Sequence, residues 1–226
     1  MVSCELGAPL AAQSLAAARA REPELRILDA REAAAFALGH PAGAGRLGQA
    51  EFATRRMELP SRATPLVVVH DQPAAARAAA DALVAAGYER VQWLEQPLAR
   101  EADGLVSHEP AARLWSASSF LERVIGRCPP GRALDLASGS GRAAVYLALT
   151  GRHVEAWDVD ARALALASAF ATRHGVRIDV RECDLEAGPL PVPEPRFDLI
   201  VVVRYLHREL FPWLERAIAP GGALVY

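Results

Sequence analysis

Two glycines and a later aspartate form the pattern that most clearly predicts chemistry in this sequence. Gly139 and Gly141 stand in ALDLASGSGRAAVYLA (133–148), between an apolar run and an Ala-rich segment. Glycines at such a turn let the backbone approach a ligand, and the helix start that follows offers unpaired N–H groups. Asp158 ends the next apolar run, where a carboxylate can accept hydrogen bonds from both hydroxyls of a ribose. Asp158 alone could instead cap a helix that begins near Ala161, but its combination with the glycine turn favours a nucleoside-containing ligand.

A second group of reactive side chains lies in RYLHREL (204–210), directly after the apolar run 197–203. An imidazole can act as a general base near neutral pH, and a guanidinium can hold an anionic group through two hydrogen bonds. His207 and Arg204 are therefore the candidate catalytic residues. The alternative is that both belong to the solvated start of a helix.

Composition excludes several classes of protein. The 226 residues carry a net charge of −2, which argues against a nucleic-acid binder that relies on bulk positive charge. All 25 basic residues are Arg, so a Schiff-base lysine and the P-loop lysine are excluded. The longest apolar runs are far shorter than the ~20 residues that span a bilayer, and no signal peptide is recognisable. The three cysteines are widely spaced, so we expect no metal site and a reducing, cytoplasmic setting.

Two successive series of strands and helices position these residues. In the first half, strands are expected at 26–30, 65–70 and 90–95, and a helix at 74–86. In the second half, strands are expected at 132–137, 153–158, 176–183, 197–203 and 223–226, and helices at 110–126, 142–149, 161–174 and 206–219. The alternation predicts an α/β fold with two parallel-sheet domains. We place these domains at residues 1–97 and 111–226, joined by a linker at 98–110 that has no apolar periodicity.

The second half resembles the class I S-adenosylmethionine-dependent methyltransferases over about residues 110–226. The resemblance rests on the order of five motifs: ALDLASGSGR (133–142), HVEAWD (153–158), Cys183-Asp184-Leu185, FDLI (197–200) and a helix followed by Pro-Gly-Gly. It implies a Rossmann-like core and S-adenosyl-L-methionine as cofactor. It also implies cofactor-binding roles for Asp135, Ala137, Ser138, Gly139, Gly141, Asp158, Val159, Asp184, Leu185 and Val203.

For the amino-acid and ribose parts of the cofactor, the resemblance implies three contributions. Asp135 would help to position the amino-acid part through the loop backbone or a water, and the glycine turn would line the methionine and ribose region. Asp158 would bind the ribose hydroxyls. Many members of the family have Gly where this chain has Ala137, which is a small change.

The resemblance also implies that residues after three of the strands contact the adenine and the methionine of the cofactor. Val159 would pack on the adenine, and Asp184 and Leu185 would contact it, with Asp184 accepting from the exocyclic amine. Val203 and Arg204 would face the methionine end and the substrate.

The first half resembles a rhodanese-like domain over about residues 10–100. RILDAREAAAFALGHPAGA (26–44) carries that family's Asp-x-Arg-Glu, aromatic and Gly-His elements, although the Ile-Pro pair is altered. The family places a catalytic Cys directly after the strand that here ends at His70, and Asp71 stands in its place. A carboxylate cannot carry the sulfane sulfur that a thiolate carries. We therefore expect no sulfurtransferase activity of the usual kind, and we expect Asp71 to cap the following helix with Pro73 in its first turn.

These observations predict methyl transfer from S-adenosyl-L-methionine to a small-molecule acceptor, with a thiol or other sulfur group as one candidate. The alternative is a non-catalytic cofactor- and partner-binding protein in which both domains are degenerate; a nicotinamide-dependent oxidoreductase is disfavoured by the Cys-Asp-Leu and FDLI pattern. We expect no nucleic-acid or membrane partner, and a homodimer or a protein partner of the rhodanese-like domain stays open. The methyltransferase core of this family has seven strands, so the second domain is expected to be incomplete after its fifth strand.

Overall fold

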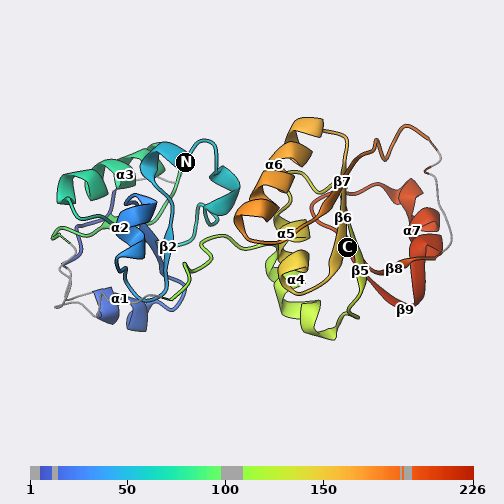
Figure 1. Ribbon diagram of the computed structural model, residues 1–226, viewed down its shortest axis with the longest axis horizontal. Coiled ribbons are helices and arrows are strands. Elements are labelled where there is room, and N and C mark those ends of the chain that lie inside the picture. Colours follow the sequence, from blue (N-terminus) through green and yellow to red (C-terminus); the bar gives the residue numbers. More distant parts are fainter. Residues whose placement is uncertain (1–5, 12–14, 98–108, 189, 191–194) are drawn as a thin grey trace. The chain divides into compact units, whose positions relative to one another are not determined.

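The computed structural model describes residues 6–11, 15–97, 109–188, 190 and 195–226. The chain divides into two compact units, Met1–Trp115 and Ser116–Tyr226 (Figure 1). Each unit contains a parallel β-sheet of its own. The expected α/β fold with two parallel-sheet domains is therefore confirmed.

The sheet of the first unit has four strands in the order β2-β1-β3-β4. The strands are β1 (Arg26–Asp29), β2 (Ala44–Arg46), β3 (Leu66–Val69) and β4 (Val91–Trp93). The helices are α1 (Leu15–Arg21), α2 (Ala33–Ala37) and α3 (Pro73–Ala85), with short 3-10 helices at Gln49–Glu51 and Arg56–Glu58. All four residues of β3 are buried, as is typical of a parallel strand covered on both faces.

Alternation along β3 divides the core of the first unit between the two faces of the sheet. Val67 and Val69 pack in one cluster with Phe36 of α2. Leu66 and Val68 pack in a second cluster, to which α3 contributes. Because successive side chains of a strand point to opposite faces, the unbroken apolar run of β3 lets helices cover both.

The boundary between the two units lies a few residues later than the sequence indicates. The backbone N–H of Ala112 donates to the carbonyl of Ala44 at 2.9 Å, and Leu114 is buried in the core of the first unit. A Cβ atom on Gly45 would collide with Leu114, so this approach requires the glycine in β2. Most of the expected linker, residues 98–108, lies outside the described residues.

The helix expected from about Pro110 to Gly126 is wrong in its first part. Residues 110–118 form no helix, and α4 comprises only Ser119–Val124, followed by a 3-10 turn at Ile125–Arg127. The helical propensity of the earlier residues is overridden because they pair with β2 and pack on the first unit.

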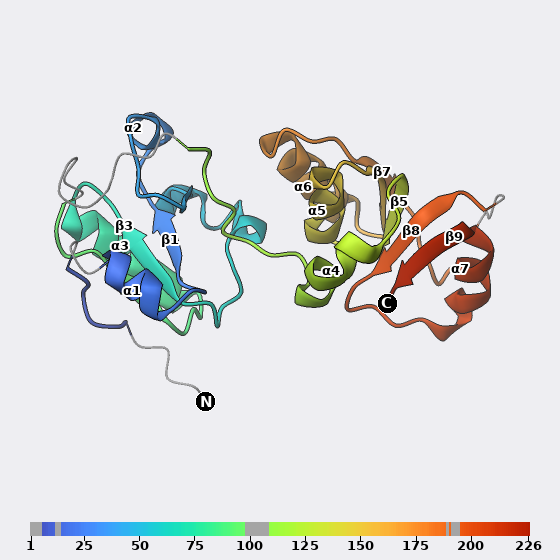
Figure 2. The same ribbon diagram turned by 90° about the horizontal axis from the view of Figure 1, so that it is seen from below.

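The sheet of the second unit has five parallel strands in the order β7-β6-β5-β8-β9. The strands are β5 (Arg132–Leu136), β6 (His153–Asp158), β7 (Asp179–Glu182), β8 (Phe197–Val202) and β9 (Ile218–Val225). The helices are α5 (Arg142–Leu149), α6 (Ala161–Arg173) and α7 (Phe211–Ala217), which a 3-10 helix at Arg208–Leu210 precedes. Helices α4, α5 and α6 cover one face of the sheet and α7 covers the other (Figures 1 and 2). None of the described helices is long and apolar enough to cross a membrane.

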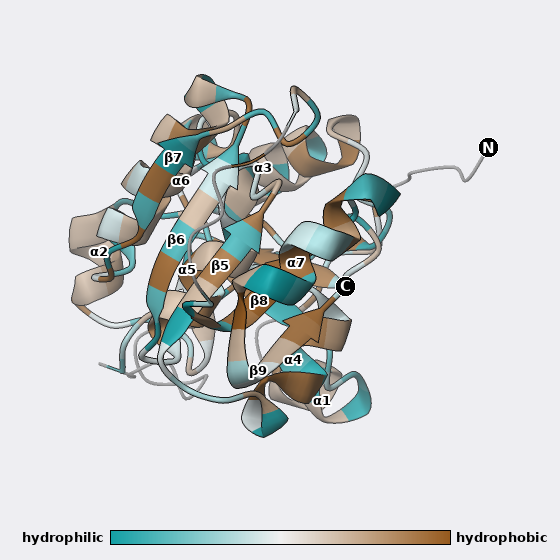
Figure 3. Cartoon of the chain, turned by 90° about the vertical axis from the view of Figure 1, so that its right-hand side faces the viewer, coloured by the Kyte–Doolittle hydropathy of each residue, from teal (hydrophilic) through white to brown (hydrophobic). Residues whose placement is uncertain are grey.

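Two segments of the second unit differ from the sequence expectation. Strand β7 begins at Asp179 rather than at 176, and its four residues are exposed because it forms one edge of the sheet. Helix α7 ends at Ala217, and the Pro-Gly-Gly at 220–222 lies within β9, whose register against β8 shifts between Phe197 and Leu199. Figure 3 shows hydrophobic residues side by side on β8 and β9.

Gly141 is a position in this unit at which a side chain would be both strained and in collision with a neighbouring helix. Its φ is +82°, and a Cβ atom there would lie 2.5 Å from Cβ of Ala167 in α6. We expect Gly141→Ala to lower the free energy of unfolding of the second unit by about 3 kcal/mol, because left-handed strain and overpacking add.

Gly151 provides the matched control, since its φ is +85° and a Cβ atom would meet nothing within 4 Å. Gly151→Ala is expected to cost about 1 kcal/mol, from backbone strain alone. Urea unfolding of both variants measures the difference, and equal losses would show that close packing of α5 on α6 does not require the glycine.

Candidate cofactor-binding site

The candidate site residues of the second unit gather at one edge of its sheet. Strands β5, β6, β7 and β8 are parallel, with Leu136 paired to both Trp157 and Val202, and Asp158 paired to Glu182. The segments that follow these strands therefore leave the sheet at the same edge. In open α/β sheets this edge, beside the central strand where the connections reverse direction, is where ligands bind.

The turn after β5 has an unusual backbone conformation, with three residues of positive φ. Ala137, Gly139 and Gly141 all have positive φ, at +52°, +53° and +82°. The N–H of Ser138 donates to the carbonyl of Trp157 at 3.0 Å, which fixes the turn against β6. The replacement of a family Gly by Ala137 therefore carries left-handed strain, which the sequence alone does not reveal.

Asp158 contacts this turn directly. Its Oδ2 accepts from the N–H of Gly139 at 2.7 Å, and its Oδ1 accepts from the N–H of Asp160 at 2.9 Å. Asp160, not Asp158, caps α6 by accepting from the N–H of Arg162 at 2.8 Å. The alternative reading of Asp158 as the cap of α6 is therefore wrong.

Asp135 lies near the end of β5, just before the turn, and is buried. Its Oδ2 accepts from the N–H of Ala144 in the first turn of α5 at 2.9 Å. Burial raises the pKa of Asp135 to about 7; the hydrogen bond from Ala144 opposes this rise and the charge of Asp158 adds to it. Asp135 thus links the end of β5 to the start of α5 by a hydrogen bond, which helps to fix the conformation of the turn between them.

The turn also has a hydroxyl group and a stretch of backbone that can contact a ligand. The hydroxyl of Ser138 is buried and has no hydrogen-bond partner among the described residues. A Cβ atom on Gly139 would meet nothing within 4 Å, so its backbone borders open space. A buried polar group without a partner costs free energy, and a polar ligand that bonds to it removes that cost.

The loop after β7 presents two neighbouring residues in different ways. Asp184 is exposed, and its Oδ1 accepts from the N–H of Glu186 at 2.9 Å. Leu185 is buried in the core with Trp157 and Trp213. Val159, after β6, is 62% exposed and free to pack on a flat ligand.

The segment after β8 carries the two candidate catalytic residues. Val203 is half-buried, and Arg204 is exposed with a φ of +60°. His207 is half-buried and lines a cavity of about 330 Å³ together with Leu185 and Trp213. Its backbone N–H donates to the hydroxyl of Tyr226 at 3.1 Å.

In the first unit, the loop after β3 places Asp71 beside a buried arginine. Arg31 forms hydrogen bonds with both carboxylate oxygens of Asp29, and its Nη1 lies 3.1 Å from Oδ1 of Asp71. The expectation that Asp71 caps α3 is wrong: the residue at the cap position is Gln72, whose side chain makes no capping bond. Pro73 does begin the helix, as expected. Asp71 turns toward Arg31 instead because the guanidinium offers it a charge-assisted bond.

Two domain families account for most of the chain. Residues 133–222 match the family model described as a methyltransferase domain, and residues 11–97 match the rhodanese-like domain. The chain therefore contains a rhodanese-like domain at residues 11–97 and a methyltransferase domain at residues 133–222.

Among curated proteins, the similarity extends over part of each relative. The chain is 38% identical over 96 residues to ribosomal protein L11 methyltransferase of Thermus thermophilus, which is 42% of this chain and 37% of that protein. It is 37% identical over 98 residues to an uncharacterised protein of Mycobacterium tuberculosis, with 41% and 35% covered. The chain thus spans little more than a third of these relatives.

Solved structures are similar over about half of the chain. A TehB-like S-adenosylmethionine-dependent methyltransferase from Corynebacterium glutamicum is 25% identical, with 45% of this chain and 58% of that chain covered and a TM-score of 0.38. A methyltransferase from Geobacter sulfurreducens, solved with S-adenosyl-L-homocysteine, is 24% identical, with 47% and 45% covered and a TM-score of 0.41.

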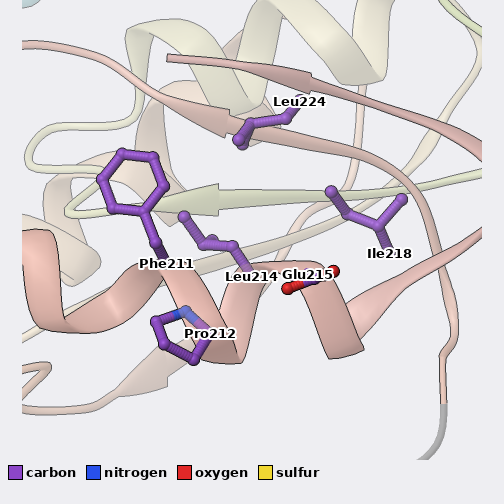
Figure 4. Close-up of a pocket in the computed structure, with 6 residues that line it drawn as sticks. All are labelled: Phe211, Pro212, Leu214, Glu215, Ile218 and Leu224. Carbon is purple, nitrogen blue, oxygen red and sulfur yellow. The ribbon is translucent and has the colours of Figure 1, made fainter.

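A second cavity of the methyltransferase domain is lined by none of the expected site residues. It measures about 400 Å³ and is lined by α7 and β9 (Figure 4), through Phe211, Pro212, Leu214, Glu215, Ile218 and Leu224. Glu215 is its one charged lining residue, so its chemistry is that of an apolar groove.

Sequence reasoning missed two residues that join the loops at the sheet edge. The hydroxyl of Tyr205 donates to Oε1 of Glu186 at 3.1 Å. Their separation of 19 residues carries no periodic signal, so only the fold brings them together.

Proposed function

We propose that this chain transfers a methyl group from S-adenosyl-L-methionine to a small-molecule acceptor, with a thiol or other sulfur-group compound as the first acceptor class to test. The observation that carries the proposal is the contact between Asp158 and Gly139 at the carboxyl edge of the sheet. It places a carboxylate beside an open glycine turn whose Ser138 hydroxyl lacks a partner. These residues fit a ligand that combines a ribose with a polar amino-acid tail.

In this proposal, the residues that follow different strands bind different parts of the cofactor. The turn at 137–141 holds the methionine and ribose region, with Asp135 shaping it from below and Asp158 accepting from the ribose hydroxyls. The adenine lies against Val159 and the loop that carries Asp184 and Leu185. When bound, the cofactor supplies a methyl group on a positively charged sulfur.

The segment after β8 faces the acceptor in this proposal. Val203 borders the methionine end, Arg204 binds an anionic group of the acceptor, and His207 removes a proton from an acceptor that carries one. A thiolate acceptor needs no base, and holding the two reactants in line then provides much of the rate acceleration.

An acceptor screen that follows the release of S-adenosyl-L-homocysteine tests the proposal. The screen uses the full chain with small thiols, sulfur-group anions, amines and carboxylates. Release above background with one acceptor class is the expected result. Cofactor binding without turnover of any acceptor would favour the alternative of a cofactor- and partner-binding protein.

We propose that the rhodanese-like unit is a scaffold or a partner-binding module, including for a second copy of the chain, and that it does not transfer sulfur. With Asp71 paired to Arg31, the loop carries a carboxylate where sulfur transfer needs a thiolate. The purified chain is expected to release no thiocyanate from thiosulfate and cyanide above the uncatalysed rate. A rate comparable with that of an active rhodanese measured beside it would contradict this role.

We also propose a reducing, cytoplasmic setting, with which the free thiols of Cys128 and Cys183 are compatible.

A further inference from the structure

We infer that Tyr205 and Glu186 are a positioning pair that holds the loop after β7 against the segment after β8, so that the adenine end of the site is formed before the cofactor binds. This inference rests on the proposed function. It concerns residues to which neither the family motifs nor the expected site assigns a role.

The first support is the geometry of the contact. The Tyr205 hydroxyl donates to Oε1 of Glu186 at 3.1 Å. Glu186 follows Leu185 directly, and its N–H is bonded to the Asp184 carboxylate at 2.9 Å. The bond from Tyr205 therefore acts on a loop of three residues that the proposed function places against the adenine.

The second support is the anchoring of Tyr205 itself. The strained turn at Arg204, with a φ of +60°, comes directly before it, and its ring packs against the core of the domain. Two residues later, the N–H of His207 donates to the Tyr226 hydroxyl at 3.1 Å. The segment is thus fixed on both sides of Tyr205, and backbone strain of this kind persists only where the surrounding structure holds it.

The third support is the environment of the loop. The cavity of about 330 Å³ is lined by Leu185, Glu186 and Leu190, which follow β7, and by His207, Leu210 and Trp213, which follow β8. Leu185 anchors the loop in the core, but Asp184 and Glu186 on either side of it are exposed, and the loop borders this cavity. Exposed loop residues have few packing contacts, so their position depends strongly on each hydrogen bond that they make.

The Tyr205 hydroxyl keeps its proton and so remains a hydrogen-bond donor to Glu186. Burial, the hydrogen bond to Glu186 and the charge of that carboxylate together raise the pKa of Tyr205 to about 12. The phenol therefore keeps its proton throughout the pH range in which the protein would be assayed.

Calorimetric titration of the full chain with S-adenosyl-L-homocysteine tests the inference. Tyr205→Phe and Glu186→Leu are each expected to weaken binding about 3- to 10-fold, the loss that corresponds to the typical net contribution of one intramolecular hydrogen bond. Glu186→Gln should bind within about twofold of the wild type, because its amide oxygen still accepts from the phenol. The double variant Tyr205→Phe/Glu186→Leu should bind no more weakly than either single variant, since both remove the same bond.

Tyr88→Phe is the matched control, because it removes the hydroxyl that donates to the Pro60 carbonyl in the rhodanese-like unit. It should leave the dissociation constant unchanged. Wild-type affinity in Tyr205→Phe and Glu186→Leu, or losses that multiply in the double variant, would overturn the inference while leaving the proposed function intact. A wild-type chain that does not bind S-adenosyl-L-homocysteine would overturn the proposed function and this inference with it.

Discussion

Replacing Asp158 with Ala is expected to weaken binding of S-adenosyl-L-methionine by about 100-fold or more. The carboxylate accepts from the N–H of Gly139 at 2.7 Å, and in the proposed complex it also accepts from the ribose hydroxyls. Its loss removes the charge-assisted hydrogen bonds to both ribose hydroxyls, each worth about 1.5–3 kcal/mol, and it also releases the turn at Gly139. Calorimetric titration of the wild type and the variant measures the effect.

Asp160→Ala is the control for this substitution. It removes the same side chain two residues later, and with it the bond from the Arg162 N–H that caps α6. We expect a loss of about 1 kcal/mol in stability and an unchanged affinity for the cofactor. If Asp160→Ala weakened binding as much as Asp158→Ala, the effect would belong to the start of α6 and not to a ribose contact.

Replacing Asp135 with Asn is expected to stabilise the methyltransferase domain above neutral pH. The pKa of Asp135 is raised by burial from its ordinary value of 3.8 to about 7 in the folded chain. Between these two values the folded state binds more protons than the unfolded state, so wild-type stability falls as pH rises through this window. Asn mimics the neutral acid and still accepts from the N–H of Ala144, so it removes this pH dependence.

The size of the effect follows from the shift in pKa. At pH 8 we expect Asp135→Asn to exceed the wild type in free energy of unfolding by about 2–4 kcal/mol, and at pH 4 the two should be nearly equal. Urea unfolding at both pH values measures the difference. Asp135→Ala, which leaves the Ala144 N–H without its partner, should be less stable than Asp135→Asn at either pH. If Asp135→Asn were less stable than the wild type at pH 8, this result would contradict the claim that burial raises the pKa of Asp135 and favours its neutral form.

Much of the methyltransferase domain could be predicted from local sequence patterns. Helix α5 and strand β6 begin and end where the sequence predicts, because a glycine turn, apolar runs and Gly151 mark their limits. The pairing of Asp158 with the glycine turn also follows from sequence, since parallel strands bring their carboxyl ends to one edge.

Tertiary contacts explain what the sequence could not predict. Residues 112–115 have helical propensity, but the bond from Ala112 to Ala44 and the burial of Leu114 keep them extended on the rhodanese-like unit. Asp71 looks like a helix cap in sequence, yet Arg31, 40 residues earlier, attracts it. Both outcomes depend on partners distant in sequence, which propensity and spacing do not register.

The most direct test of the account is a calorimetric titration of the unaltered 226-residue chain with S-adenosyl-L-methionine, beside a titration with NADH. One saturable site per chain for S-adenosyl-L-methionine, nearly abolished by Asp158→Ala and absent for NADH, is the predicted result. No binding of S-adenosyl-L-methionine, binding that Asp158→Ala leaves intact, or a site for NADH instead would contradict the assignment of the carboxyl edge as a methyl-donor site.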